Sequence, residues 1–511
     1  MPWWILSLIV LAGLIIVVAL YDLIQSKDPI LRSFPVVGHG RKLLSSSGPK
    51  LRQYIVASND EELPFSRDQR RWVYDSADAK SAYFGFGTDT IIDRNSHVIV
   101  KHSAFPDSTP IGENAAVPCA KIMGEWRDRR HKFRPESVVY VSAMSFGSLS
   151  ARAVEAINRG CEIAGALHNT GEGGIADHHR HGGELIYQVG TGYFGCRNRD
   201  GTFSLDRLAE TVDSATVRCI ELKLSQGAKP GLGGVLPGKK VTPEIAQARG
   251  LPVGQTVISP NRHSAFDDVD GLIDMIESIA DRTGLPVGIK SAVGQQDFWN
   301  DLAGRISSRG EGPDFITIDG GEGGTGAAPL AFSDHVSLPF RAAFSRAYAP
   351  FVEAGINTNI VFSGSGKLGF PAEALLAFGL GVDMVGVARE PMLALGCIQA
   401  QRCHDGHCPT GITTHNKWLV RGLDPTDKAT RLANYLVSFR SEILKLSHAC
   451  GVIHPALVNA DMIEIFEEPH RWSTARELFA SDQDLQCITR TQHDALQEVM
   501  VELAATNATS S

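Results

Sequence analysis

Three cysteines late in the chain have the residue type and spacing of metal ligands. Cys397, Cys403 and Cys408 lie within twelve residues in "GCIQAQRCHDGHCPTG", with the spacing Cys-x5-Cys-x4-Cys. Three thiolates are one short of the four ligands of a structural zinc site or a usual four-iron cluster. They match the count of a 3Fe-4S cluster, whereas zinc would have to recruit His404 or His407. The spacing therefore predicts an iron-sulfur cluster, with a zinc site and simple burial as the alternatives.

Glycine-rich loops carry the second group of candidates. The stretch "KLSQGAKPGLGGVLPGKKV" holds five glycines and four lysines and includes Lys223, Gln226 and Lys229. Cations and bare backbone amides both attract carboxylate or phosphate, so this stretch predicts an anion site. A flexible, solvated loop is the alternative. Two "GEGG" stretches place Glu172 and Glu322 where each is either a proton-transfer group or only a turn former.

Further candidates close other short apolar runs. Lys290 ends "VGIKS" and is either a charge beside a flavin ring or half of an internal salt bridge. The small residues of "SAMSFGSLS" would let a flat ring lie against Ala143, Met144 and Ser145, although a packed strand end with a serine helix cap explains them equally. The stretches "SGSGKLG" and "GVARE" offer backbone N–H groups to a phosphate, or form ordinary tight turns. The phosphate candidates are Gly364, Ser365, Gly366, Gly386, Val387 and Ala388.

The elements that must position these residues form an alternating pattern from about residue 135. Eight β-branched runs end in these loops: "SVVYVSAMS", "AGALHNTGEGG", "CIELKLSQG", "TVISP", "LPVGIKSAVG", "DFITIDGGEGG", "NIVFSGSG" and "DMVGVARE". Helical stretches over 151–163, 269–282, 299–308 and 371–380 separate many of them. Eight βα units in about 260 residues predict an α/β fold, a TIM (β/α)8 barrel, whose catalytic residues lie at the carboxyl ends of the strands.

Length and composition bound the remaining possibilities. The 511 residues exceed the size of a typical single core, and 51 glycines are more than usual for a globular chain. The net charge of −8 without a long basic run argues against nucleic-acid binding. The other six cysteines show no framework spacing, which favours a reducing compartment.

The N-terminus predicts a membrane anchor. Residues 3–21 carry no charge and would span about 28 Å as a helix. No basic residue precedes the run and no small-x-small site follows it, which favours an uncleaved anchor over a signal peptide. Six basic residues follow within about thirty positions, so the positive-inside tendency places the catalytic part in the cytoplasm. We predict four regions: an anchor (1–27), a lead-in domain (28–135), the barrel (136–396), and an iron-sulfur loop with a helical C-terminal region (397–511).

Five ordered motifs resemble a known family. "SAMSFGSLS", "HNTGEGG", "KLSQGAKPGLGGVLPGKKV", "DGGEGGTGAAP" and "GCIQAQRCHDGHCPTGITT" resemble, in the same order, the FMN-binding barrel of the glutamate synthase large subunit. The resemblance covers about residues 138–450. It implies FMN and a 3Fe-4S cluster as cofactors, and reduction of 2-iminoglutarate, formed from 2-oxoglutarate and ammonia, to L-glutamate.

The resemblance also implies a role for each candidate. Cys397, Cys403 and Cys408 would hold the cluster, and Glu172 would lie where ammonia arrives. The oxo-acid region would take in Lys223, Gln226 and Lys229. The flavin would lie against Ala143, Met144, Ser145 and Lys290, with its phosphate on Gly364, Gly366, Gly386 and Val387.

Several positions depart from the family pattern. Tyr193 replaces an arginine and Leu232 a glutamate, while Arg262 in "SPNRHSAFDD" is a candidate for a displaced carboxylate contact. "SGSGKLG" differs from the family's "DGG". No glutaminase domain fits in the roughly 110 residues before the barrel, so nitrogen is expected free or from a partner. No nicotinamide fingerprint follows a strand, so the electron donor is expected to be a ferredoxin-type protein, a reductase subunit or a membrane carrier.

Three functions remain open at this point. The first is a glutamate-synthase-like oxidoreductase. The second is a related FMN amino-acid oxidoreductase that uses another amine or oxo acid and exchanges electrons with a membrane carrier. The third is a redox relay or sensor without turnover.

Overall fold

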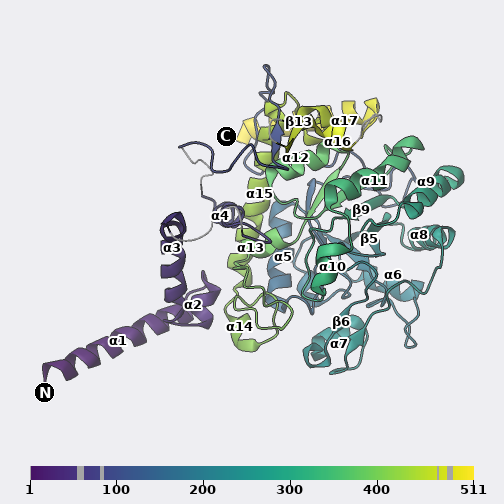
Figure 1. The fold of residues 1–511 in the computed structure, drawn as a ribbon. Coiled ribbons are helices and arrows are strands. Elements are labelled where there is room, and N and C mark those ends of the chain that lie inside the picture. Colours follow the sequence, from purple (N-terminus) through teal and green to yellow (C-terminus); the bar gives the residue numbers. More distant parts are fainter. Residues whose placement is uncertain (1, 55–61, 81–85, 469–470, 480–486, 511) are drawn as a thin grey trace.

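The centre of the protein is a closed barrel of eight parallel strands, in the order β10-β11-β2-β3-β4-β5-β8-β9 (Figure 1). The computed structural model describes residues 2–54, 62–80, 86–468, 471–479 and 487–510. The barrel strands are β2 (Val139–Val141), β3 (His168–Asn169), β4 (Leu185–Val189), β5 (Val217–Lys223), β8 (Val287–Ser291), β9 (Phe315–Asp319), β10 (Val361–Ser365) and β11 (Met384–Val387). The predicted (β/α)8 barrel is confirmed.

One of the eight predicted strands is wrong and one was missed. "TVISP" gives β7 (Val257–Ile258), which pairs antiparallel with β6 (Val235–Leu236) outside the barrel. The missing barrel strand is β4, which pairs with β3 and β5. Only the short 3-10 helix η1 (Asp177–His179) separates β3 from β4, so the strand-helix alternation that guided the prediction is interrupted there. The strand that ends at Lys223 is therefore the fourth of the barrel, not the third.

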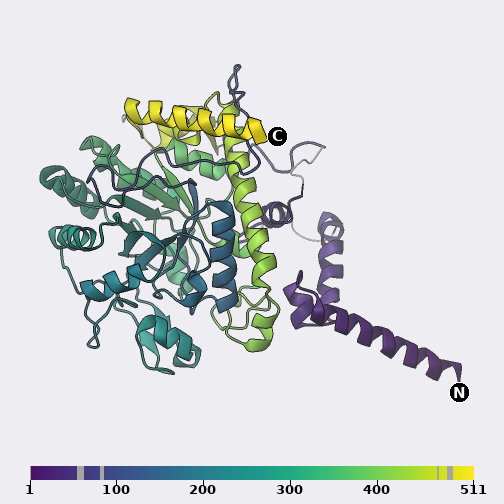
Figure 2. The same ribbon diagram turned by 180° about the vertical axis from the view of Figure 1, so that it is seen from behind.

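Helices surround the barrel and begin and end where the local sequence dictates. They include α5 (Ala151–Ala164), α6 (Leu205–Asp213), α8 (Val269–Thr283), α9 (Asp297–Arg309), α11 (Phe340–Glu353), α12 (Pro371–Gly379) and α13 (Arg389–Ala394). Ser150 caps α5 by accepting the N–H of Ala153 at 3.3 Å, and Gly165 ends it in a left-handed conformation. The long α15 (Pro425–Ala449) packs along α5 on the outside of the barrel, as Figure 2 shows.

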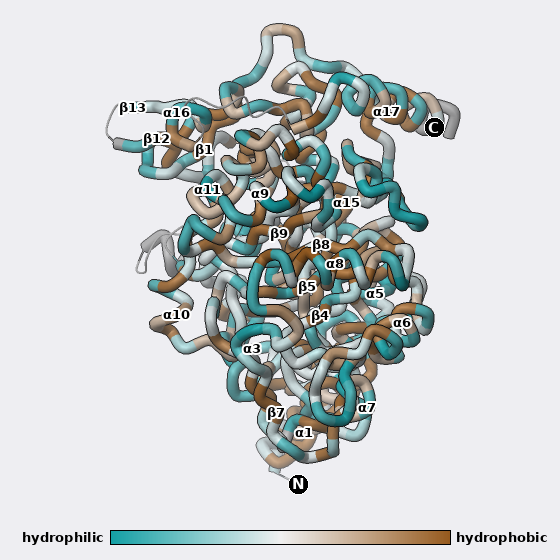
Figure 3. The backbone as a smooth tube through the Cα atoms, turned by 90° about the vertical axis from the view of Figure 1, so that its right-hand side faces the viewer, coloured by the Kyte–Doolittle hydropathy of each residue, from teal (hydrophilic) through white to brown (hydrophobic). Residues whose placement is uncertain are grey.

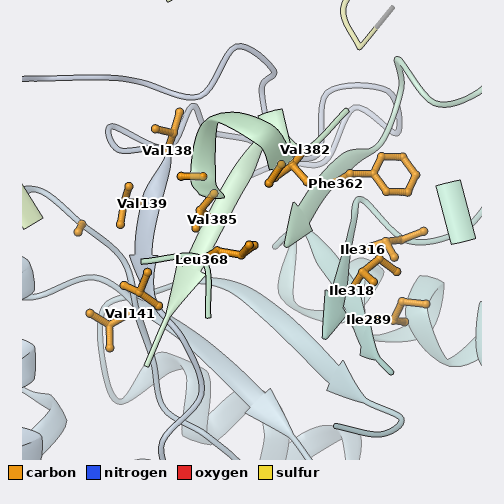
Figure 4. Packing of buried hydrophobic residues seen from close by; sticks show 14 of the residues in the cluster. Val138, Val139, Val141, Ile289, Ile316, Ile318, Phe362, Leu368, Val382 and Val385 are labelled. Atoms are coloured by element: carbon orange, nitrogen blue, oxygen red, sulfur yellow. The ribbon is translucent and has the colours of Figure 1, made fainter. Parts of the chain in front are cut away.

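The core is apolar around the strands, with one polar layer inside the barrel. Val139, Ile289 and Ile316 are completely buried (Figure 4), and burial of such a side chain stabilises the fold by roughly 1.5–3 kcal/mol. In Figure 3 the hydrophobic colour gathers at the central strands, while the outer helices alternate.

Glu221 on β5 is the polar centre of the barrel. Its buried carboxylate accepts hydrogen bonds from Asn169 (2.8 Å), Gln188 (2.6 Å) and Thr317 (2.9 Å), which belong to three other strands. A buried carboxylate is tolerated only when it is hydrogen-bonded in this way. The layer therefore fixes four strands relative to one another beneath the loops that carry the site.

Two buried ion pairs lie at the opposite end of the barrel, where strands begin. Lys121 donates to the carboxylate of Asp383 at 2.8 Å and to the carbonyls of Asn357 and Ile360. Arg129 donates to Asp314 at 3.0 Å and to Glu277 at 2.7 Å. Asp314 and Asp383 directly precede β9 and β11, and they also accept backbone N–H groups of the neighbouring strands β8 and β10.

Segments before and after the barrel share a second sheet. Strand β1 (Val98–Val100) pairs with β12 (Ile463–Glu468), which pairs with β13 (Arg471–Thr474). The helical C-terminal region thus also contains two strands, followed by α16 (Ala475–Phe479) and α17 (Arg490–Ser510).

The N-terminal segment forms an arm beside the barrel (Figure 1). It consists of α1 (Trp3–Ile24), α2 (Pro29–Ser33) and α3 (Gly38–Tyr54), and α4 (Arg67–Ala77) follows against the barrel. Among the described residues, α1 is the one helix long and apolar enough to cross a membrane, with a mean hydropathy of 2.8. Its apolar stretch is not buried against the rest of the chain, so it is not a core helix.

Candidate active site

The predicted catalytic residues meet at the carboxyl ends of the strands, on one side of the barrel mouth. A cleft with about 310 Å³ of empty space, including its open side, lies between the loops that follow β3, β4 and β5. Its lining residues are Glu172, Thr191, Lys223, Leu224, Ser225, Gln226, Gly231, Leu232, Gly233, Gly234, Pro260 and Asn261. Loops after separate strands converge here because all strands of the barrel are parallel.

Lys223, Glu172 and Gln226 form the polar centre of the cleft. The ammonium group of Lys223, at the end of β5, donates to Glu172 at 2.8 Å and to Gln226 at 2.7 Å. Burial raises the pKa of Glu172, but the opposing charges of Lys223, Lys229 and Arg249 outweigh it and hold the pKa below its ordinary value. Glu172 is therefore a carboxylate at neutral pH. The structure brings together three of the predicted catalytic residues in direct contact.

Lys229 adds a positive charge directly beside the cleft, behind the lining residue Gly233. Its side chain is buried, its ammonium group donates to the carbonyl of Gly233 at 3.3 Å, and it forms no ion pair with any described residue. Burial and the charge of Lys223 lower the pKa of Lys229. Two lysines thus face one glutamate, and this excess of positive charge suits an anionic ligand.

Lys290 lies next to Lys223 in the strand register, at the end of β8. Its ammonium group is 3.4 Å from the hydroxyl of Ser142 and 3.7 Å from the carboxylate of Asp319. Asp319 is itself held by the N–H of Gly227 at 2.9 Å and the hydroxyl of Ser365 at 2.5 Å. The salt-bridge alternative for Lys290 is thus present as a long contact, and the lysine lies between the substrate cleft and the strand ends of β9 and β10.

The loop after β2 carries Ala143, Met144 and Ser145, all partly exposed at the barrel mouth. Gly171 approaches it so closely that a Cβ atom there would lie 2.5 Å from the backbone nitrogen of Ser145. Gly171 also has a left-handed φ of 64°, which glycine adopts without strain. The first glycine of "GEGG" is therefore required to pack the Glu172 loop against the Ser145 loop.

The strand ends of β10 and β11 contain the predicted phosphate residues. A Cβ at Gly364 would meet the ring of Phe340 at 2.6 Å, and one at Gly386 would meet Tyr140 at 2.7 Å. These two glycines make room for buried aromatic rings, which is a packing reason for glycine in addition to any ligand. Gly366 has a φ of 136° and lies beside Gly320 of the β9 loop, while Ser365 and Val387 are buried.

Two cations at these strand ends were missed as site residues. Lys367 follows Gly366, and Arg389 begins α13 directly after β11. Burial lowers the pKa of both side chains, neither forms an ion pair with a described residue, and each lies over the ring of Phe65, at 5.3 and 4.9 Å from its centre. Their presence in "SGSGKLG" and "GVARE" was the signal that could have identified them.

The cysteine loop lies next to this end of the barrel mouth. Burial raises the pKa of Cys397 to about 12, and negative charge on Cys408 and Cys403 acts in the same direction, so the three thiols lie near one another. A Cβ at Gly326 would be 2.9 Å from the backbone of Cys403, so the loop after β9 touches the cysteine loop. Within the described part of the chain, no three His, Cys, Asp or Glu side chains are placed to hold a single metal ion.

Glu322, the other glutamate of the "GEGG" pair, has a structural contact. Both carboxylate oxygens accept the N–H of Phe340 at the start of α11, at 2.8 and 3.0 Å. Burial raises the pKa of Glu322. Its carbonyl oxygen accepts a hydrogen bond from Arg389, which ties the loop after β9 to the end of β11.

The departures at Tyr193 and Arg262 have different outcomes. Tyr193 is buried, and its hydroxyl oxygen accepts the N–H groups of Ser264 and Ala265 at 3.0 and 3.1 Å. His263 lies 3.2 Å from that hydroxyl and contacts the carbonyl of Lys223 at 2.9 Å. Tyr193 therefore orders the segment beside Lys223 without entering the cleft. Arg262 is exposed, pairs with Asp267 at 3.0 Å and is not among the residues that line the cleft.

The sequence matches known proteins over the region that contains this site. A profile described as a conserved region in glutamate synthase matches residues 119–453. The glutamate synthase large subunit-like protein YerD of Bacillus subtilis (strain 168) is 34% identical over 467 residues, which are 84% of this chain and 88% of that protein. The archaeal glutamate synthase (NADPH) of Methanocaldococcus jannaschii is 34% identical over 326 residues, 62% of this chain and 59% of that protein. The chain thus spans about three fifths of the archaeal enzyme.

Solved structures give a weaker likeness. A mandelate oxidase with (S)-4-hydroxymandelic acid has a TM-score of 0.44 and 14% identity, covering 73% of this chain and 88% of its own. By the match to the family profile and to YerD, the chain belongs to the glutamate synthase family.

Proposed function

We propose that this member of the glutamate synthase family is an oxidoreductase that reduces 2-iminoglutarate, formed from 2-oxoglutarate and ammonia, to L-glutamate. The observation that carries the proposal is the cleft at the barrel mouth in which Lys223 donates to Glu172 and to Gln226, with the ammonium group of Lys229 beside it. The excess positive charge of the cleft suits a substrate with two carboxylates, and the carboxylate of Glu172 suits the incoming ammonia or ammonium.

Each polar group of the cleft has a role in this reaction. Lys229 is buried without an acidic partner, so a substrate carboxylate would complete its ion pair. Lys223 would share its ammonium hydrogens between Glu172 and the second carboxylate or the oxo group. Glu172 stays ionised at neutral pH and is available to accept a proton from an incoming ammonium ion. Gln226 orients Lys223 through its side-chain oxygen.

The residues of the opposite side of the mouth fit FMN. A phosphate would neutralise Lys367 and Arg389, two partly buried cations without an ion pair to any described residue, at the strand ends where barrels of this kind bind phosphate. The partly exposed loop of Ala143, Met144 and Ser145 would line the ring, and Lys290 would lie near its polar edge. When bound, FMN supplies the hydride chemistry that no side chain here can provide. These residues orient it and exclude water.

The cysteine loop is proposed to hold a 3Fe-4S cluster. A zinc ion needs all its ligands around one point, at about 2.0–2.3 Å, and no described side chains meet that demand. In an iron-sulfur cluster each thiolate binds a different iron, so Cys397, Cys403 and Cys408 need only face one another. The loop is anchored by the hydroxyl of Tyr74, which donates to the carbonyl of Cys397 at 2.6 Å. Its contact with the β9 loop supports a cluster close to the proposed flavin site.

The nitrogen source and the electron donor are proposed to be separate molecules. Ammonia would come free or from a partner enzyme, and electrons from a ferredoxin-type protein, a reductase subunit or a membrane carrier. The apolar, unburied α1 favours the membrane carrier and a single-pass anchor with the barrel in the cytoplasm.

Anaerobic reoxidation tests the proposal. Purified protein is reduced, 2-oxoglutarate is added with ammonium or methylammonium, and flavin absorbance is followed. Reoxidation with ammonium and formation of glutamate support the proposed reaction. If the flavin is reoxidised only with the alkylamine, the protein is an oxidoreductase that uses another amine. If no oxo acid reoxidises the flavin, the protein is a redox relay or sensor without turnover.

Metal analysis tests the cluster separately. Cys403→Ser should remove iron and the visible absorbance of the cluster, whereas Cys450→Ser, a buried cysteine at the end of α15, should change neither. Zinc in place of iron in the wild-type protein would contradict the assignment.

A further inference from the structure

The N-terminal arm packs directly against the barrel side of the chain through α2. Helix α2 packs against α14 (Lys417–Arg421), which follows the cysteine loop in sequence. The indole N–H of Trp418 donates to the carbonyl of Ser33 at 2.5 Å, and Lys428 donates to the carbonyl of Lys27 at 2.7 Å. A Cβ at Gly422 would lie 2.4 Å from the carbonyl oxygen of Pro29, so the two backbones are in close contact.

The end of α1 is fixed to α3 in a similar way. Asp22, in the last turn of α1, is completely buried and accepts the N–H of Val36 at 2.9 Å and a ring N–H of His39 at 3.0 Å. Helix α3 therefore leaves the end of α1 in a set direction, at a steep angle to α1 (Figures 1 and 2). If α1 spans a bilayer, the start of α3 lies at the height of the lipid headgroups.

Apolar side chains are exposed at this level. Leu43 and Leu44 on α3 are each 68% exposed, and Val37 just before the helix is 81% exposed. Phe34 and Trp418 are also exposed, although they lie where the arm meets the barrel. Tryptophan prefers the boundary between membrane and water, because one part of its ring system is apolar and the other donates a hydrogen bond.

The charge around these side chains is positive, although the whole chain carries −8. Residues 25–54 contain six Lys and Arg and one acidic residue, Asp28, which Lys42 pairs at 3.1 Å. Helix α14 adds Lys417 and Arg421 and no acidic residue. Exposed apolar side chains among basic ones match a surface with anionic headgroups and apolar chains.

We propose that α3 and α14 form a second membrane-binding surface, composed of Phe34, Val37, Leu43, Leu44 and Trp418 with the basic residues Arg41 and Lys417, which binds anionic lipid and holds the barrel against the bilayer. We call it the lipid-facing surface. It rests on the proposed anchoring by α1 and goes beyond it, because α1 alone would bring neither α3 nor α14 into contact with lipid.

The lipid-facing surface lies close to both ends of the cysteine loop. The loop begins at Gly396, whose Cβ would lie 3.7 Å from the ring of Pro29 in α2, and it leads into α14 through Asn416. Both of its ends are therefore tied to the arm. A redox partner in or on the membrane reaches the loop without a large movement of the barrel.

Fluorescence quenching by brominated lipid tests the lipid-facing surface. The full-length protein is placed in nanodiscs of phosphatidylcholine and phosphatidylglycerol, with or without bromine on the acyl chains. The difference between the wild type and Trp418→Phe isolates one of the seven tryptophans. We expect bromine to quench that difference signal, and Arg41→Glu with Lys417→Glu to abolish this quenching. The matched control, Arg199→Glu with Arg207→Glu, reverses two exposed charges near α6, on the side of the barrel away from α1, and should retain it.

Alkaline carbonate extraction separates the surface from the anchor. Absence of bromine quenching at Trp418 overturns the lipid-facing surface, whether or not the chain resists extraction. Extraction of the chain together with quenching at Trp418 overturns the spanning role of α1 and keeps the surface. Neither result depends on turnover, so failure of the proposed reaction would be seen independently.

Discussion

The two ends of the barrel use the same charged residue types in opposite ways. At the end where strands begin, Lys121 and Arg129 are buried with complete sets of partners, among them Asp383 and Asp314. At the mouth, Lys229 is buried without an acidic partner. A buried charge costs several kcal/mol unless it is paired, so the closed end is built for stability and the mouth is built to receive anions.

The mouth itself has two sides. On one side Lys223 already holds Glu172 and Gln226, so a ligand must share or replace existing contacts. On the other side Lys367 and Arg389 have no acidic partner to release among the residues that the structure describes. This difference suits an exchanging substrate on the first side and a permanently bound phosphate on the second.

The largest effect is expected from removing a charge at the closed end. Lys121→Met leaves Asp383 buried without its cation, which should lower the free energy of unfolding by about 3–5 kcal/mol. Urea denaturation measures it. The double variant Lys121→Met with Asp383→Asn should recover much of the loss, because no unpaired charge remains. A stable single variant with altered activity would contradict the structural assignment of this end.

At the substrate side of the mouth, Lys223→Met should change the pH dependence more than the stability. Without Lys223, an adjacent opposite charge is lost, and burial then raises the pKa of Glu172. The acidic limb of the pH profile of kcat/KM should therefore move to higher pH. Lys445→Met, which removes an exposed lysine paired with Glu442, is the control and should leave the limb in place. An unmoved limb in Lys223→Met would mean that Glu172 is not the titrating group.

At the cofactor side of the mouth, Arg389→Ala should weaken FMN binding by about 10- to 100-fold, since a hydrogen bond to a charged group contributes roughly 1.5–3 kcal/mol. Flavin fluorescence on dilution measures the affinity. The free energy of unfolding of the flavin-free protein should fall by only about 1 kcal/mol, because Arg389 loses its hydrogen bond to the carbonyl of Glu322 and its contact with the ring of Phe65, but no ion pair with a described residue. Arg305→Ala on the outer face of α9 serves as the control. Equal loss of stability and of FMN would show that Arg389 is structural, like Arg129.

The smallest effect concerns Glu277 at the closed end. Burial raises its pKa, but hydrogen bonds from Arg129, Arg127 and the N–H of Gly312 lower it to about 2, from an ordinary value of 4.5. The ionised group stabilises the fold above pH 4.5, and this contribution is lost as the pH falls toward 2. Glu277→Gln should therefore cost about 1 kcal/mol at pH 7, and the difference from wild type should shrink below pH 4.5. A difference that is constant with pH would contradict the assigned ion pair.

The sequence by itself determined the barrel and the identity of most candidate residues. Alternating apolar runs and helices predict eight parallel strands, and parallel strands bring their carboxyl-end loops together, so Glu172, Lys223 and Gln226 could be grouped before the structure was seen. The cysteine spacing could be recognised in the same way, because it is a local property. The prediction took "TVISP" as a barrel strand and missed β4. Periodicity alone does not separate the two, because a two-residue strand in an inserted loop and a barrel strand have similar local sequences.

Only the tertiary structure decided which charges are satisfied. Nothing in the local sequence tells whether Lys121 or Lys229 has an acidic partner. In the fold, Lys121 donates at 2.8 Å to Asp383, which is 262 residues away in the sequence. Lys367 and Arg389 likewise became site residues only when they were found partly buried at the barrel mouth, without an ion pair to any residue that the structure describes. The packing of α2 on α14, which joins residues nearly 400 positions apart, fixes the apolar helix relative to the cysteine loop. Ion pairing and burial depend on contacts between distant segments, and no local pattern records them.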